Sequence, residues 1–147
     1  MKRIANEIEV IINSALENLE LIQGLTDCVT AFMRFEADTA HWIGMSVREA
    51  VTNAIQHGNK LDAGKTVVIV FELAADRLGV SVRDQGRGFK ADNIPSPLDQ
   101  DNLLKPSGRG IFYIRSFMDE VEFKSLPHGG TEVYMVKRIL SNGGECR

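Results

Sequence analysis

The apolar residues of this chain change their spacing along the sequence in an order that few folds accommodate. Residues 4–12 alternate loosely between apolar and polar positions, which predicts a strand. The next two segments repeat their apolar residues every three or four positions, which predicts helices. The predicted elements are a strand at 4–12, helices at 16–35 and 38–57, strands at 66–73 and 78–82, a helix at 111–118, and strands at 121–125 and 131–137.

This order does not alternate strand and helix as repeated βαβ units do. It predicts an α+β fold, a two-layer α/β sandwich whose mixed, mostly antiparallel sheet carries its helices on one face. We expect Asn13 or Ser14 to cap the first helix, Asp38 to cap the second, and Gly58 to end it. Residues 86–110 have the composition of a loop. Without a repeat or a linker, residues 1–147 are expected to form a single domain.

Composition excludes several classes of function. The net charge is −3 and both signs are mixed along the chain, which argues against direct nucleic-acid binding. No apolar run approaches the roughly 20 residues that span a bilayer, and the amino terminus does not resemble a signal peptide. Two cysteines, Cys28 and Cys146, do not suggest a disulfide framework, and no His/Cys spacing suits zinc. We therefore expect a cytoplasmic protein.

The second predicted helix carries a polar stripe beside its buried face. The stripe begins at Glu49, with Thr52 and Asn53 three and four residues later and Gln56 three residues after Asn53. A carboxylate next to a carboxamide oxygen suits Mg²⁺, which prefers hard oxygen ligands. The alternative is an ordinary solvated stripe on an amphipathic helix.

A glycine turn follows the strand at 78–82. Asp84 precedes Gly86 and Gly88, and glycines at this spacing let the backbone approach a ligand or adopt positive φ. The aspartate is suited to accept a hydrogen bond from a ligand amine such as that of adenine. A tight turn with a locally bonded aspartate is the alternative.

A second glycine turn, formed by Ser107, Gly108, Arg109 and Gly110, opens the helix predicted at 111–118. Free N–H groups and the helix dipole make such a start favourable for phosphate, although a flexible helix entry is the alternative. Neither G-K-[ST] nor G-x-G-x-x-G is present, which disfavours P-loop and Rossmann folds.

Taken in order, these segments resemble a known superfamily. Residues 49–58 (EAVTNAIQHG) resemble the N box of the gyrase/Hsp90/histidine-kinase/MutL ATPases, whose domain is the Bergerat ATP-binding fold. Residues 84–89 (DQGRGF) resemble the first glycine box of that superfamily, and residues 107–111 (SGRGI) resemble the second.

The short length, together with residues 117–121 (FMDEV) and 129–133 (GGTEV), resembles the anti-sigma-factor serine/threonine kinases of bacteria. The resemblance covers residues 4–137. It implies ATP and Mg²⁺ as cofactors, and transfer of phosphate to a Ser or Thr of a STAS-domain anti-anti-sigma partner. It also implies a cytoplasmic homodimer that sequesters a sigma factor.

The resemblance assigns a role to each matching residue. Asn53 would bind Mg²⁺ and ATP, Asp84 would bind the adenine amine, and Glu49 would be the general base, with a minor ATP-binding role for His57. Further ATP-binding residues would be Gly86 and Gly88 at the adenine end and, around the phosphates, Lys105, Ser107, Gly108, Arg109 and Gly110. One position departs from the family, because Pro106 stands where a basic residue commonly precedes the second box. Lys105 or Arg109 is the alternative cation for the terminal phosphate.

Two other functions remain open from the sequence. The nucleotide site is also consistent with a conformational switch for partner choice with little or no phosphate transfer. A stand-alone histidine-kinase-type catalytic domain is less favoured, because residues 16–35 contain no histidine to accept phosphate. Gyrase and MutL relatives would need further transducer domains.

Overall fold

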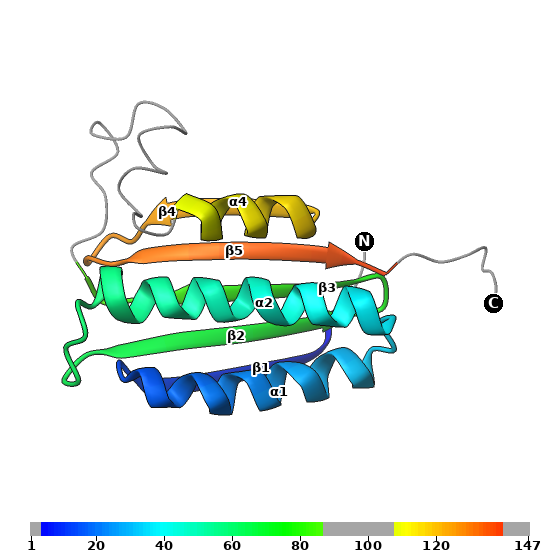
Figure 1. Ribbon diagram of the computed structural model, residues 1–147, viewed down its shortest axis with the longest axis horizontal. Helices are drawn as coiled ribbons and strands as arrows, with labels where there is room; N and C mark the ends of the chain where they lie inside the picture. The colour runs from blue at the N-terminus through cyan, green and yellow to red at the C-terminus, as the bar shows by residue number, and fades with distance from the viewer. Residues whose placement is uncertain (1–3, 87–107, 140–147) are drawn as a thin grey trace.

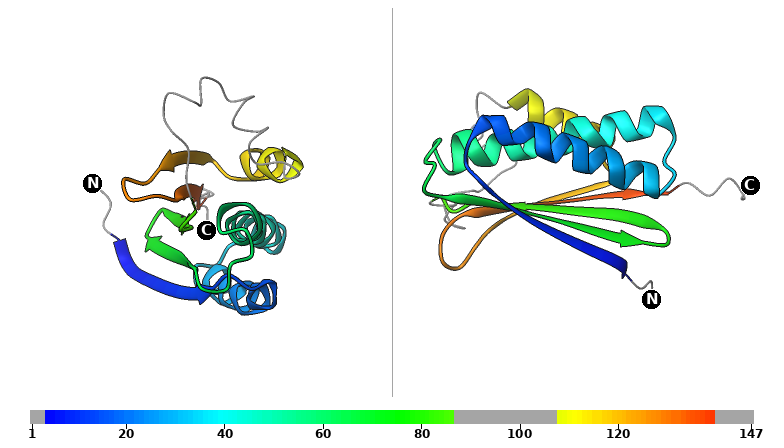
Figure 2. Two further views of the ribbon diagram at one scale, coloured as in Figure 1. Left: turned by 90° about the vertical axis from the view of Figure 1, so that its left-hand side faces the viewer. Right: turned by 90° about the horizontal axis from the view of Figure 1, so that it is seen from below.

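The computed structural model describes residues 4–86 and 108–139. Within them, one five-stranded sheet carries three α-helices on a single face (Figures 1 and 2). The strand order is β1-β2-β3-β5-β4, and all four neighbouring pairs are antiparallel. The strands are β1 (Ile4–Asn13), β2 (Thr66–Ala74), β3 (Arg77–Arg83), β4 (Glu120–Ser125) and β5 (Thr131–Arg138). The predicted α+β sandwich with a mostly antiparallel sheet is confirmed.

The helices are α1 (Leu19–Phe32), α2 (Ala37–Asn53) and α4 (Gly108–Phe117), and α2 lies between the other two (Figure 1). The core forms where α2 meets the sheet. Val47 and Val51 of α2 and Val67, Ile69 and Phe71 of β2 are fully buried there. Each such side chain stabilises the fold by about 1.5–3 kcal/mol on burial. No helix in the described ranges is both long and apolar enough to cross a membrane.

The predicted helix caps are wrong. The N-cap position of α1 is Asn18, and Asn13 and Ser14 bond elsewhere: Asn13 donates to the Ala63 carbonyl, and the Ser14 hydroxyl accepts from Asn59. Helix α2 begins at Ala37, so Asp38 lies within its first turn rather than before it. Neither helix has a side-chain cap bond at its start.

The helix boundaries differ from the predicted ones in three places. Helix α1 ends at Phe32 instead of residue 35, because Arg34 adopts a left-handed conformation with φ 64°. Helix α2 ends at Asn53 instead of residue 57, and a π-helix (Ala54–Gly58) follows it directly and includes Gly58. Such wider turns occur frequently at functional sites. Helix α4 begins three residues before the predicted residue 111, and most of the predicted loop at 86–110 lies outside the described residues.

Candidate functional site

A cavity of about 630 Å³ opens at the end of the sheet where α2 finishes. Its volume lies within the range of about 300–1,000 Å³ that is usual for small-molecule sites. Segments distant in sequence line it: Asn53 and His57 come from the end of α2 and its π-turn, Asp84 follows β3, Thr131 begins β5, and Ile114 belongs to α4. The structure thus brings Asn53 of the polar stripe together with Asp84 and Gly86 of the first glycine turn, whereas Glu49, Thr52 and Gln56 do not line the cavity.

Asp84 is held in place by backbone groups. Its Oδ1 accepts hydrogen bonds from the Gly86 N–H at 2.9 Å and the Thr131 N–H at 3.1 Å. The Asp84 N–H also donates to the Thr131 carbonyl at 3.0 Å. Among the described residues, none donates a hydrogen bond to Oδ2, which lies against Gly58. Burial raises the pKa of Asp84, and the two backbone bonds and the nearby Lys65 ammonium partly oppose that rise.

Three glycines have no side chain and so provide the space that Asp84 occupies. A Cβ on Gly58 would overlap the Asp84 carboxylate, and a Cβ on Gly86 would overlap the Gly58 carbonyl. Gly130 has φ +100°, and a Cβ there would overlap the Asp84 carbonyl oxygen. The predicted role of Gly58 as a helix terminator is therefore incomplete, because its main effect here is to make room for the aspartate.

The end of α2 presents polar atoms that lack partners. The buried Asn53 Oδ1 and His57 Nε2 have no hydrogen-bond partner in the described part of the chain, and both residues line the cavity. Leaving such an atom unsatisfied costs about 1–3 kcal/mol, so a bound water, ion or ligand would be favourable at each of them. Ser46 Oγ is a third such atom on α2, but Ser46 does not line the cavity.

These atoms fit a magnesium–nucleotide complex. The Asn53 oxygen is a hard ligand of the kind that Mg²⁺ accepts. The described residues hold no group of three or more His, Cys, Asp or Glu side chains arranged for a metal. Mg²⁺ would therefore take its remaining ligands from phosphate oxygens and water, which is how it is usually bound beside nucleotides.

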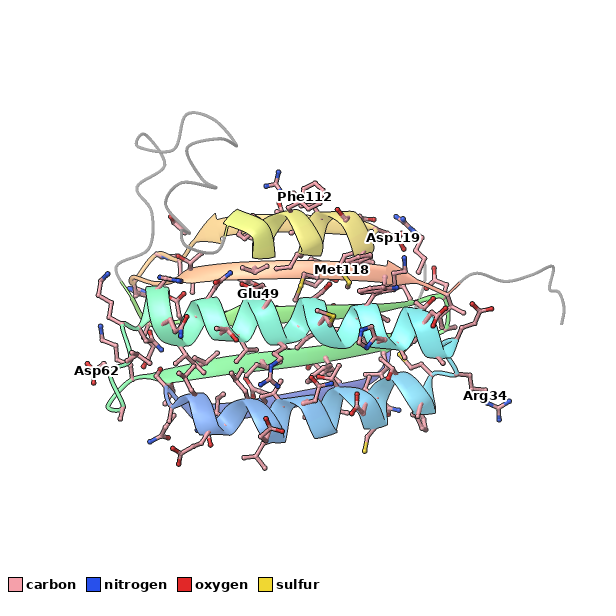
Figure 3. The ribbon with its side chains drawn as sticks, in the orientation of Figure 1. Arg34, Glu49, Asp62, Phe112, Met118 and Asp119 are labelled. Atoms are coloured by element: carbon pink, nitrogen blue, oxygen red, sulfur yellow. The ribbon has the colours of Figure 1, made fainter. Side chains whose placement is uncertain are left out.

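Glu49 lies near the end of α2, one helical turn before its last residue, Asn53 (Figure 3). Its side chain is half-buried, and this burial raises the pKa of its carboxyl group. Glu49 does not belong to the cavity lining, whereas Ala50 and Asn53 do. Glu49 therefore lies one turn from the cavity residue Asn53 without lining the cavity itself.

His57 has a lowered pKa, caused first by burial and then by the positive charge of Lys60. The imidazole is therefore neutral at pH 7, with one ring nitrogen able to donate and the other able to accept. Lys60 and Lys65 both line the cavity and supply positive charge to it.

The second glycine turn is described only in part. Gly108, Arg109 and Gly110 form the first turn of α4, in agreement with the prediction that they open a helix. Gly88, Lys105 and Ser107 lie outside the described residues, as does Pro106.

The model of the histidine kinase-like ATPase domain family matches residues 12–137. This chain belongs to that family. Membership of this ATPase family implies that the chain uses ATP. Two curated relatives of this chain confirm its resemblance to the anti-sigma-factor kinases.

The serine-protein kinase RsbW of Bacillus subtilis is 32% identical over 145 residues, which cover 95% of this chain and 89% of RsbW. The anti-sigma F factor of Oceanobacillus iheyensis is 41% identical over 95 residues, covering 63% of this chain and 65% of that factor. A crystal structure of the RsbU and RsbW domains of a Mycobacterium tuberculosis protein matches with a TM-score of 0.66. That match covers 91% of this chain and 32% of the other at 17% identity, so it shows the fold alone.

Several residues of this histidine kinase-like ATPase site were not predicted from the sequence as site residues. Lys60 and Lys65 line the cavity, Thr131 donates to Asp84, and Asn59 bonds to the residue that follows Asp84. The position of Asn59 and Lys60, directly after the N-box glycine, is the one signal that pointed to them. Thr131 is brought to Asp84 by the pairing of β3 with β5, which no local pattern shows.

Proposed function

We propose that this chain is an ATP-dependent serine/threonine-protein kinase and anti-sigma factor. In this role it phosphorylates a STAS-domain anti-anti-sigma partner and sequesters a sigma factor. The observation that carries the proposal is that Asn53 and Asp84 meet in one cavity. Asn53 Oδ1 is buried there without a partner in the described structure, and two backbone N–H groups hold the Asp84 carboxylate. Similarity to a serine-protein kinase over 95% of the chain and to an anti-sigma F factor supports both activities.

Each site residue has a part in the proposed reaction. Asp84 Oδ2 accepts a hydrogen bond from the adenine amine, while Oδ1 stays bonded to the backbone. Asn53 Oδ1 would hold Mg²⁺, which when bound neutralises charge on the phosphates. Neutral His57 and the cations of Lys60 and Lys65 face the same nucleotide. The glycine-opened start of α4 offers backbone N–H groups to phosphate.

Glu49 is the proposed general base. The oxygen of the acceptor hydroxyl forms a bond to the γ-phosphorus as the bond from that phosphorus to ADP breaks, and the hydroxyl proton passes to the Glu49 carboxylate. A raised pKa makes this carboxylate a stronger proton acceptor. Its place beside the cavity suits a hydroxyl that arrives on a separate protein.

The remaining parts of the proposal concern the state of the protein. We propose that residues 1–147 act as one ATPase domain, that two copies form a homodimer, and that the protein works in the cytoplasm. Sedimentation velocity of the purified chain tests the homodimer, for which the expected result is a single species of twice the chain mass.

The test of the function is transfer of labelled phosphate from ATP to a STAS-domain partner, with a partner lacking its acceptor hydroxyl as the blank. Glu49→Gln should lower transfer by roughly 10²–10⁴-fold, the usual range for loss of a general base. Nucleotide affinity should be unchanged. Glu17→Gln is the matched control, since Glu17 is an exposed glutamate in the short turn before α1.

Transfer by Glu17→Gln should equal that of the parent protein. Robust transfer by Glu49→Gln would remove Glu49 from the role of base. Absence of transfer by the parent protein to its verified partner would instead favour the conformational switch.

A further inference from the structure

Asn59 is a fully bonded, buried amide at the edge of the nucleotide cavity. It follows Gly58 directly, and only 1% of its surface is exposed. Its Nδ2 donates to Ser14 Oγ at 2.5 Å and to the Thr66 carbonyl at 2.9 Å. Its Oδ1 accepts from the Gln85 N–H at 2.7 Å. One side chain therefore joins the end of α2 to the ends of three strands.

The bond to Gln85 links the two chain segments that face each other at Asp84. Residues 58–60 and 84–86 approach so closely that neither Gly58 nor Gly86 has room for a Cβ. Within the described ranges, no backbone–backbone hydrogen bond joins these two segments. The Asn59 side chain makes the direct polar connection between them.

This connection bears on the position of the second carboxylate oxygen of Asp84, Oδ2. Backbone bonds from Gly86 and Thr131 hold Oδ1, whereas Oδ2 lies against Gly58. The separation between Gly58 and Oδ2 therefore depends on how firmly segment 58–60 is held against segment 84–86.

We infer that Asn59 is a positioning residue for recognition of the adenine base. It acts by accepting a hydrogen bond from the Gln85 N–H, which holds the Gly58 backbone against the Asp84 carboxylate. In this position Oδ2 accepts a hydrogen bond from the base amine. The inference rests on the proposed contact between Asp84 and adenine. It does not depend on phosphate transfer.

The test compares the affinities for ATP and for purine riboside triphosphate, which lacks the 6-amino group. The parent protein should prefer ATP. Asn59→Ala should weaken ATP binding about tenfold, the equivalent of one hydrogen bond, and leave binding of the analogue unchanged. A merely structural role would weaken both nucleotides equally, so the ratio of the two affinities is the decisive readout.

Two variants serve as matched comparisons. Ser14→Ala removes one Nδ2 bond and keeps the link to Gln85, so it should leave the preference for ATP unchanged. Asn59→Asp keeps the accepting Oδ1 and loses both donors, so it should lower stability but retain the preference. This variant also serves if Asn59→Ala does not fold.

An equal loss of both nucleotides in Asn59→Ala, or a lost preference in Ser14→Ala or Asn59→Asp, would overturn the inference. Equal affinity of the parent protein for both nucleotides would overturn the role of Asp84, and the inference with it. Failure of phosphate transfer alone would affect only the kinase proposal.

Discussion

The two ends of the nucleotide cavity are built in opposite ways. At Asp84, the protein supplies its own partners: two backbone N–H groups hold one carboxylate oxygen, and glycines clear the space around it. Along α2, Asn53 Oδ1 and His57 Nε2 are buried without partners among the described residues. The first end is complete before a ligand arrives, and the second is completed by the ligand.

In the proposed function, the Asp84 end recognises the base and the α2 end serves phosphate transfer. A pre-bonded carboxylate reads the base without rearrangement, which reduces the ordering cost of binding. An unsatisfied amide oxygen costs the free protein about 1–3 kcal/mol, which metal or phosphate can recover on binding. Substitutions at the two ends should therefore have distinct effects on nucleotide binding.

The largest effect is expected where Gly86 packs against Gly58. Gly86→Ala forces a Cβ into the Gly58 carbonyl, which is backbone and has little freedom to move. We expect the free energy of unfolding to fall by about 3 kcal/mol and nucleotide binding to be lost. The control is Gly24→Ala on α1, where nothing lies within 4 Å, and which should raise stability by up to about 1 kcal/mol. Urea unfolding measures the stability of both variants. A Gly86→Ala protein as stable as the parent would show that the Gly58 backbone can move to make room for the added Cβ.

Asp84→Asn should affect binding and not folding. The amide Oδ1 can still accept from Gly86 and Thr131, so the fold is retained. The other position becomes an N–H₂ donor facing the donor amine of adenine, which should cost about 1.5–3 kcal/mol, or roughly one to two orders of magnitude in affinity. Calorimetry with ATP measures this loss. An affinity equal to that of the parent would remove Asp84 from base recognition.

Asn53→Ala should give a smaller effect that depends on metal. We expect ATP affinity to fall about tenfold with Mg²⁺ present and to stay unchanged in its absence. The free energy of unfolding should not fall, because the Asn53 oxygen has no partner to lose in the described structure. The same calorimetric titration with and without a chelator decides this, and a loss that ignores Mg²⁺ would count against a metal role.

The smallest effect concerns the pH dependence of stability. Burial raises the pKa of Asp84, so the folded protein retains this proton to higher pH than the unfolded chain does. The resulting stability is present below the ordinary aspartate pKa and is lost as pH rises through the raised value. The stability of Asp84→Asn relative to the parent should therefore increase with pH across that window. A relative stability that falls with pH would mean that the backbone bonds outweigh burial.

Much of this architecture follows from local patterns in the sequence. Apolar periodicity located every described helix and strand, and the motifs around Asn53 and Asp84 pointed to two residues that line one cavity. Helix starts were harder, because Ser14 has a capping side chain that is instead bonded to Asn59. Its partner lies 45 residues away, and no local rule predicts such a contact.

The closing of the site around Asp84 was also beyond local reasoning. The contribution of Thr131 depends on the register between β3 and β5, and the role of Gly58 depends on how α2 docks at the end of β3. Glycine and threonine have many local uses, so their tertiary role appears only when the strands are paired.

The most direct test of the two-ended site is a set of titrations with AMP and ATP, each with and without Mg²⁺. AMP engages the adenine end and lacks the terminal phosphates, so its affinity should be independent of Mg²⁺ and should fall in Asp84→Asn but not in Asn53→Ala. ATP affinity should rise with Mg²⁺, and Asn53→Ala should remove that rise. Two results would contradict the account, because they would mean that the two ends are not separate. One is an AMP affinity that rises with Mg²⁺ as the ATP affinity does, and the other is an equal loss of affinity for both nucleotides in Asn53→Ala.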